Sequence, residues 1–192
     1  MHEVCLDAFC IGKHEVTQSQ WKRVMGDNPS GFKQGNDYPV ENVSWDDVTM
    51  FINKLNSLDS NNRFRLPTEA EWEYACRSGG QLEPYSGSSR IDTVTWYNEN
   101  SGGITHPVNT KESNKLGLFN FSGNVREWCS DIYAKDSYAN HRRNNPINIK
   151  GGLEHVVRGG CWYYEAKIAR CSNRYSYPTD RQRTDLGFRA IA

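Results

Sequence analysis

Six cysteines are the residues of this chain most able to do chemistry, because a thiolate can act as a nucleophile or bind a soft metal. They are scattered along the sequence: Cys5, Cys10, Cys76, Cys129, Cys161 and Cys171. None forms a C-x-x-C pair and no histidine lies at zinc-ligand spacing, which argues against a structural zinc site. Two interpretations stay open: free, buried thiols in a cytosolic protein, or disulfides in an oxidising compartment.

Other enzyme motifs are absent from the sequence. It contains no G-x-S-x-G, no H-E-x-x-H and no phosphate-binding glycine-rich loop before a helix. The five histidines are dispersed, and an isolated histidine is more often a surface or core residue than a catalytic base. Equal numbers of acidic and basic residues give no net charge, which argues against a nucleic-acid partner or an anionic membrane surface. No signal peptide is visible, and no apolar run approaches the roughly twenty residues that span a bilayer.

Capping patterns predict three helices in the first half of the chain. Thr17 and Gln20 form a capping-box pattern, Trp21 and Val24 then share one helical face, and the helix is expected to end at Gly26. A second helix is predicted after Ser44, with apolar residues at helical spacing: Val48, Phe51, Ile52 and Leu55. A third is predicted after Thr68, because Glu71 follows three residues later.

The sequence changes character from Gly79 onward. Glycine, serine, asparagine and proline separate short apolar runs such as VTWY, HPVN, GLFNF and HVVRGG, which we interpret as short strands joined by long loops. Residues 140–152 are the most loop-like stretch, and the opening MHEVCLDAFC is interpreted as a strand. These patterns predict a single α+β domain over residues 1–192, loop-rich and with little regular secondary structure.

Four motifs carry a resemblance to a known family. They are IGKHEVTQSQW (Ile11 to Trp21), RLPTEAEWEYACR (Arg65 to Arg77), GLFNFSGNVREWCSD (Gly117 to Asp131) and the segment from Arg158 that holds RGGCW and LGFR. In this order they resemble the formylglycine-generating enzyme (sulfatase-modifying factor) family, over essentially the whole chain. The resemblance implies that family's C-type lectin fold. Members usually carry more sequence before this point, which favours a truncated N-terminus.

The resemblance fails at the catalytic cysteines. Enzymes of the family oxidise a substrate cysteine with copper and oxygen, using two cysteines five residues apart shortly after the RGG turn. Here Cys161 takes a position that is usually serine, and Cys171 matches a structural cysteine. In the alternative alignment Cys161 reaches a catalytic position, but its partner would be Ala166. One thiolate cannot make a bis-thiolate copper site, so we expect no copper and no such catalysis. A copper-dependent formylglycine-generating oxidase, or a degenerate relative acting on a protein cysteine, is the alternative.

Two structural sites follow from the same resemblance. The cysteines of EYACR and RCSNR match positions that are cross-linked in the family's enzyme, which implies a Cys76–Cys171 disulfide. The loop NFSGNVREW matches a calcium site in the family, which implies a structural calcium held by the Asn120 side chain, the Gly123 and Val125 carbonyls and the Glu127 carboxylate. The alternative is that Asn120 and Glu127 hydrogen-bond backbone amides within the loop.

The C-terminal segment has a second resemblance, to the variable proteins of diversity-generating retroelements. The residues that match their frame are Arg158, Gly159, Gly160, Trp162, Asn173, Arg174, Leu186, Gly187, Phe188 and Arg189. Between them lie the candidate ligand-binding residues Tyr163, Tyr164, Glu165, Ile168, Tyr175, Tyr177, Gln182, Thr184 and Asp185. Tyrosines mixed with short polar residues are typical of an antibody-like binding surface. The alternative is that these tyrosines cover the core or simply face solvent.

The sequence therefore predicts a non-catalytic display module that binds a protein or glycan ligand through its C-terminal surface. The resemblance to variable proteins favours a location at the cell surface, in the secreted fraction or on a virion. We expect no nucleic-acid partner and no membrane span.

Overall fold

Capping side chains begin the three longer helices where the sequence predicts them. The structure, a computed structural model, describes residues 3–192. Its longer helices are α1 (Gln18–Met25), α2 (Trp45–Leu58) and α3 (Glu69–Cys76). Each has a complete capping box, in which the N-cap side chain accepts the third backbone N–H and the third side chain accepts the N-cap N–H. α1 ends at Gly26, whose φ of 98° is left-handed, so the predicted end is confirmed.

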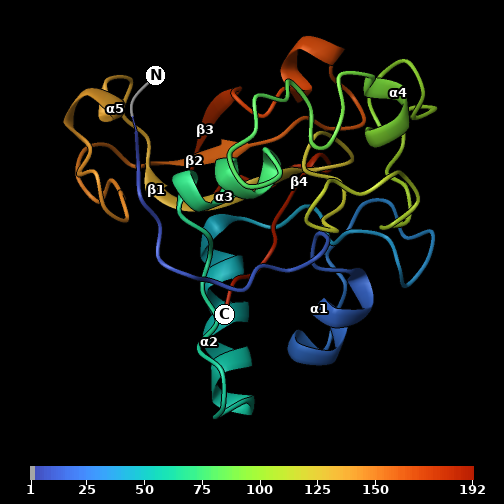
Figure 1. Ribbon diagram of the computed structural model, residues 1–192. Coiled ribbons are helices and arrows are strands. Elements are labelled where there is room, and N and C mark those ends of the chain that lie inside the picture. Colours follow the sequence, from blue (N-terminus) through green and yellow to red (C-terminus); the bar gives the residue numbers. More distant parts are fainter. Residues whose placement is uncertain (1–2) are drawn as a thin grey trace.

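A four-stranded sheet occupies the middle of the molecule (Figure 1). Its strands are β1 (Arg126–Ile132), β2 (Glu154–Arg158), β3 (Arg174–Pro178) and β4 (Leu186–Gly187), in the order β3-β2-β1-β4. β1 pairs antiparallel with β2, and β2 pairs antiparallel with β3. The short β4 pairs parallel with β1 at its start, Arg126 opposite Leu186. Strand β4 thus returns the end of the chain to the middle of the fold.

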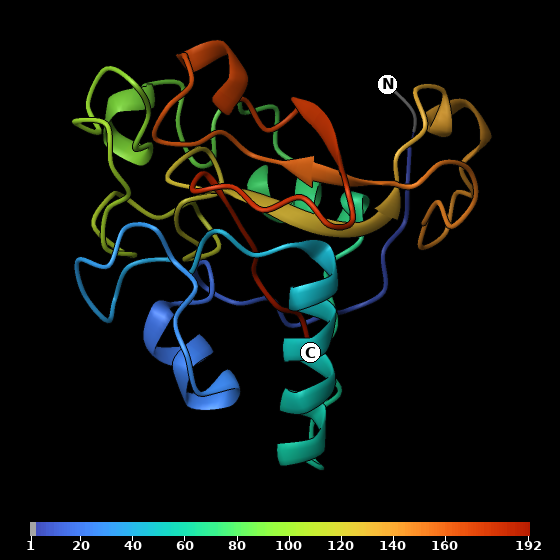
Figure 2. The same ribbon diagram turned by 180° about the vertical axis from the view of Figure 1, so that it is seen from behind.

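Neighbouring residues of the sheet point into two different hydrophobic clusters. Trp128 and Val157 belong to the cluster that holds α1 and α2, whereas Cys129 and Val156 belong to the cluster that holds α3. Side chains alternate between the two faces of a sheet, so α3 covers one face and α1 and α2 lie against the other. Figures 1 and 2 show α1 and α2 at one end of the molecule and β3 near the opposite end.

Several predicted strands are wrong. VTWY, HPVN and GLFNF are loops or turns apart from Val94, which ends the four-residue helix α4 (Ile91–Val94), whereas HVVR is strand β2 as predicted. Two more single turns, α5 (Ser137–Asn140) and η1 (Ala166–Ala169), are too short to show helical periodicity in the sequence. The long strand β1 begins in the segment for which the sequence predicts only a calcium-binding loop.

The predicted N-terminal strand is also wrong for the described residues, and Met1 and His2 lie outside them. The segment up to Val16 makes isolated bridges instead, between Cys5 and Asn144 and between Ile11 and Ile191. The partners of this segment come from scattered parts of the chain, so no continuous ladder forms. Apart from Asn140, which ends α5, the predicted loop 140–152 contains no helix or strand. It holds the N-terminal segment through the Arg143 carbonyl, which accepts from the Cys5 N–H at 2.8 Å.

Within residues 3–192, no helix is both long enough and apolar enough to cross a lipid bilayer.

Candidate binding surface

Glycines fix the backbone on which the candidate residues lie. Gly159 has a φ of 77°, and a Cβ there would lie 2.9 Å from the Phe121 carbonyl oxygen. A Cβ at Gly187 would lie 2.4 Å from the Val40 carbonyl oxygen. Real Cβ atoms do not approach that closely, so only glycine fits at these positions. The glycines of the RGG and LGFR motifs therefore let the backbone pack closely against neighbouring segments of the chain.

Two buried arginines of the same motifs hold the ends of the segment in place. Arg158 donates to the carbonyls of Cys171 at 2.8 Å and Asn173 at 2.6 Å, and it also pairs with Glu73. Arg189 forms a two-pronged pair with the Glu127 carboxylate at 2.6 and 2.7 Å. Both guanidinium groups are buried and paired with carboxylates, which is the arrangement that a buried charge requires.

The predicted disulfide is confirmed: Cys76 of α3 is bonded to Cys171, which follows η1. The bond joins one helix to the segment that carries the candidate residues. The other thiols are free, with Cys5 and Cys10 exposed and Cys129 and Cys161 buried. Burial raises the pKa of Cys161 to about 12, so this thiol is protonated at neutral pH.

A buried arginine also lies at the centre of the candidate residues. Arg126 of β1 is only 2% exposed, and its guanidinium lies 4.1 Å from the ring centre of Tyr164 and 4.8 Å from that of Tyr175. It donates a 2.8 Å hydrogen bond to the Tyr177 hydroxyl. Aromatic faces attract a guanidinium, so Arg126 brings together tyrosines that are distant in sequence. No carboxylate forms an ion pair with Arg126 among residues 3–192.

Ring contacts extend this cluster into a continuous band. The ring centres of Tyr163 and Tyr164 are 5.2 Å apart, those of Trp162 and Tyr163 5.5 Å, and those of Tyr175 and Tyr177 5.0 Å. These separations are typical of aromatic pairs in contact. We call the group made by Arg126, Trp162, Tyr163, Tyr164, Tyr175 and Tyr177 the tyrosine surface.

The candidate residues differ in exposure. Tyr163 is 58% exposed and Tyr175 is 49% exposed. Glu165, Gln182 and Thr184 are also exposed, whereas Tyr164 and Ile168 are half-buried. The most accessible rings of the tyrosine surface therefore belong to two segments, one after the RGG turn and one in β3.

Two candidate residues are buried, contrary to the expected exposure. Tyr177 packs in the core cluster beside Trp128, with ring centres 6.3 Å apart. Burial raises its pKa to about 12. The Asp185 carboxylate accepts a 2.6 Å hydrogen bond from Arg183 and lies 3.5 Å from the Cys161 sulfur. Both residues support the surface from below and are not available to a ligand.

The remaining candidates lie at the ends of the surface. The Thr184 carbonyl accepts a 3.0 Å hydrogen bond from the Trp162 indole, so this loop reaches the aromatic band. Gln182 donates to the Asp47 carboxylate at the start of α2. Glu165 pairs with Lys167 at 2.7 Å. Ile168 lies in η1.

The predicted calcium residues are partly engaged with protein groups. The Glu127 carboxylate already accepts from Arg189 and from the Trp72 indole, at 2.7 Å. One of its oxygens, Oε1, accepts a single bond, from Arg189, so a lone pair there remains. The buried Asn120 Oδ1 has no hydrogen-bond partner in the described structure, and its amide nitrogen donates to Glu15 at 3.0 Å.

These donors fit a hard cation, because an unpartnered amide oxygen and a carboxylate oxygen with a free lone pair are both ligands that calcium prefers. Burial raises the pKa of Glu15 to about 8, against the opposing influence of Arg189. No cluster of three or more histidine, cysteine or acidic residues suited to a metal occurs within residues 3–192. The carbonyls of Gly123 and Val125 would supply the other oxygens, so calcium at this loop stays a prediction.

The model of the sulfatase-modifying factor enzyme 1-like domain matches residues 1–192. The chain belongs to this family. This sulfatase-modifying-factor domain is 33% identical over 240 residues to the chaperone protein LppX of Paenibacillus barcinonensis, covering 98% of the chain and 81% of that protein. It is 31% identical over 191 residues to the formylglycine-generating enzyme of Streptomyces coelicolor, covering 91% of the chain but only 58% of that enzyme.

Solved structures confirm the fold of this sulfatase-modifying-factor domain. It superposes on variable protein 1 of Treponema denticola with a TM-score of 0.85 at 31% identity, covering 98% of the chain and 86% of that structure. It superposes on PvdO of Pseudomonas aeruginosa with a TM-score of 0.83 at 22% identity, covering 95% and 79%. The formylglycine-generating-enzyme type of C-type lectin fold is thus confirmed, as is the similarity to a variable protein.

Sequence reasoning missed Arg126 as a candidate residue. Arg126 stands beside Glu127 in a motif that we had assigned to calcium, so nothing marked it as the centre of an aromatic cluster. The contacts of Arg126 with Tyr175 and Tyr177 depend on the order β3-β2-β1 in the sheet, which no local sequence pattern shows.

Proposed function

We propose that this domain is a non-catalytic binding module that presents the tyrosine surface to a protein or glycan ligand. The observation that carries the proposal is the pair of exposed rings, Tyr163 and Tyr175, joined through Tyr164 and the buried Arg126. Tyrosine supplies a large amphipathic contact area at low cost in conformational entropy. The similarity to variable protein 1 of Treponema denticola supports the same function.

The frame beneath the surface suits a display role. Its glycines and paired arginines are buried, whereas the side chains of Glu165, Gln182 and Thr184 extend into solvent. Substitutions at exposed positions usually change stability little. These exposed residues can therefore vary without loss of the fold.

We further propose an oxidising location, at the cell surface, in the secreted fraction or on a virion. The Cys76–Cys171 disulfide supports this assignment, because such bonds persist in oxidising compartments.

The test uses a glycan array and an array of extracellular protein domains, each probed with the wild-type domain and a double variant, Tyr163→Ala with Tyr175→Ala. Exposed aromatic anchors carry much of the energy of an interface, so we expect the double variant to bind wild-type hits at least about tenfold more weakly. Tyr74→Ala is the matched control, because Tyr74 is 44% exposed but lies on α3. Equal binding by wild type and double variant would contradict the proposal.

The alternative function is a copper-dependent oxidase, and the arrangement of thiols gives it no support. Cys171 is in a disulfide, Cys161 is buried beside Asp185, and position 166 is alanine. We expect no aldehyde to form on a peptide containing C-x-P-x-R incubated with the domain, copper and oxygen. Aldehyde formation above a heat-denatured control would establish the oxidase.

Calcium is proposed as a structural ligand of Asn120, Gly123, Val125 and Glu127. When bound, it would compensate the buried carboxylates and take no part in chemistry. An ion bound only by the folded state stabilises it by about 2.7 kcal/mol at one hundred times its Kd. We expect the melting temperature to fall with EDTA and to recover with calcium but not with magnesium. An unchanged melting temperature would remove the site.

A further inference from the structure

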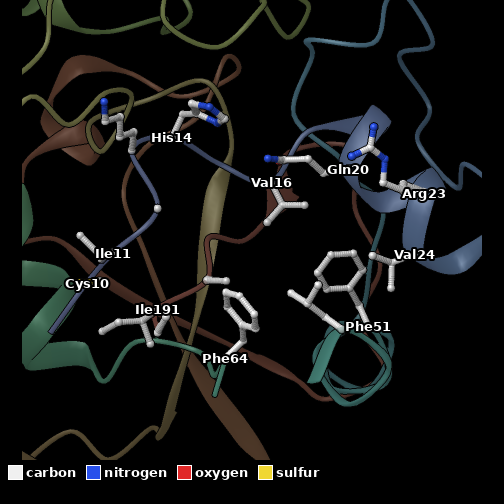
Figure 3. Close-up of a pocket in the computed structure, with 15 residues that line it drawn as sticks. Cys10, Ile11, His14, Val16, Gln20, Arg23, Val24, Phe51, Phe64 and Ile191 are labelled. Atoms are coloured by element: carbon white, nitrogen blue, oxygen red, sulfur yellow. The ribbon is translucent and has the colours of Figure 1, made fainter. Parts of the chain in front are cut away.

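A cavity of about 590 Å³ opens between α1, α2, residues 10–16 and residues 190–192 (Figure 3). Helices α1 and α2 lie at the opposite end of the molecule from η1 and β3 in both Figure 1 and Figure 2. The cavity is therefore separate from the tyrosine surface. Its volume lies in the range of small-molecule sites, about 300–1,000 Å³.

One side of the cavity is apolar and continuous with the core. Its side chains are Val16, Val24, Phe51, Leu55, Phe64 and Ile191. Phe51 and Ile191 are almost fully buried, so the floor is rigid, whereas Leu55 and Phe64 are half-buried and remain open to a ligand. A hydrocarbon chain laid on this side would remove apolar surface from water, at about 25 cal/mol for each Å².

The other side carries positive charge. Figure 3 places His14, Gln20 and Arg23 along the edge that faces Ile191, Phe64 and Phe51 across the cavity. Lys13 also lines the cavity. Lys13 and Arg23 are exposed, and neither forms an ion pair among the described residues. The described side chains of the lining include Lys13 and Arg23 but no aspartate or glutamate.

We propose that this cavity binds a small amphipathic anion, an aliphatic chain that ends in a carboxylate. The chain would lie against Leu55 and Phe64, and the carboxylate would pair with Arg23, with Lys13 as a second positive charge in the lining. A low-dielectric cleft lined by one sign of charge concentrates ligands of the opposite sign. A guanidinium matches the two oxygens of a carboxylate, so the charge and the apolar floor together select this class of ligand.

The test titrates the domain with decanoate, below its critical micelle concentration, by isothermal calorimetry. Acetate provides the anion without the chain, and decyltrimethylammonium provides the chain with the opposite charge. We expect saturable binding of decanoate and at least tenfold weaker binding of both others. Equal binding of decanoate and decyltrimethylammonium, or no saturable binding of decanoate, would overturn the proposal.

Two double variants locate the site. Lys13→Gln with Arg23→Gln should weaken decanoate binding about tenfold or more, because the anion loses both charged partners. Lys22→Gln with Lys54→Gln removes the same charge from exposed positions of α1 and α2 that do not line the cavity, and it should bind as wild type does. If both double variants weaken binding equally, general charge attraction explains it and the site is wrong. The Tyr163→Ala, Tyr175→Ala variant should retain full decanoate binding, which separates this site from the tyrosine surface.

Discussion

Arg189 and Arg126 are both buried beside aromatic rings, yet they serve different regions of the molecule. Arg189, in the frame, lies 3.6 Å from the Phe121 ring centre and is paired with a carboxylate through two bonds. Arg126, under the tyrosine surface, has no such pair, and its Nε has no hydrogen-bond partner in the described structure. Every guanidinium nitrogen of Arg189 donates to a protein oxygen, whereas Arg126 retains an unpartnered Nε at the centre of the surface. Under the proposed function, stability and recognition therefore depend on different residues.

The largest expected effect is loss of the frame pair. Arg189→Gln leaves the buried Glu127 carboxylate without its cation, and breaking such a pair costs about 3–5 kcal/mol. Urea denaturation monitored by tryptophan fluorescence measures this loss. Arg170→Gln, at an exposed position, is the control and should change the unfolding free energy by less than about 0.5 kcal/mol. Similar unfolding free energies for the two variants would contradict the claim that stability depends on the frame residues.

Removing the disulfide should cost nearly as much. The bond joins residues separated by 95 positions, and loss of a native disulfide costs about 2–5 kcal/mol. Cys76→Ser with Cys171→Ser should unfold at lower urea, with the tyrosine surface otherwise unchanged. Cys10→Ser, which removes an exposed free thiol, is the control. A reducing agent should lower the stability of the wild type but not of the double variant.

The unfolding free energy should also depend on pH, through the buried carboxyl of Glu41. Burial raises the pKa of Glu41 from its usual 4.5 to about 7, while the Phe32 N–H donates to it at 2.7 Å and opposes the shift. The folded state holds the extra proton between these values, so the unfolding free energy should fall as pH rises from 5 to 8, by an amount on the order of 2 kcal/mol. Glu41→Gln should flatten this part of the profile measured by urea denaturation. A parallel profile for wild type and variant would contradict the assignment.

The smallest stability effect is expected at the exposed tyrosines. Tyr163→Ala and Tyr175→Ala should each change the unfolding free energy by less than about 0.5 kcal/mol, because both rings lie largely in solvent. Tyr177→Ala should cost several times more, since it removes a buried ring and leaves Arg126 without its hydroxyl partner. Thermal unfolding of the three variants measures the difference. Equal losses would mean that the tyrosines act as core.

Much of the fold could be predicted from local signals. The capping boxes at Thr17, Ser44 and Thr68 involve residues only three apart, so the sequence shows them directly. Strand β1 could not be found in this way, because its seven residues are almost all buried and show no polar alternation. The strand prediction for VTWY and GLFNF is wrong because the aromatic residues there cover the core from loops.

The candidate surface was predictable in composition but not in arrangement. Tyrosines at 163, 164, 175 and 177 stand out in the sequence, but Tyr177 is buried whereas Tyr175 is 49% exposed. The two residues lie on the same face of β3, so the difference comes from their neighbours: Tyr177 packs beside Trp128 in the core. The disulfide came from the family resemblance alone, because spacing does not determine which cysteines pair.

The pairing of β4 with β1 has a consequence for how the chain is made. The first strand of the sheet gains its parallel neighbour only when the last strand has been synthesised, and Ile191 then bridges to Ile11 and Arg65. Contacts between residues so distant in sequence slow folding, and the sheet keeps one edge of β1 unpaired until they form. The candidate ligand-binding residues lie between β2 and β4, within the stretch that must emerge from the ribosome before this closure. A new sequence there is therefore tested for its folding rate and its aggregation during synthesis before it can meet any ligand.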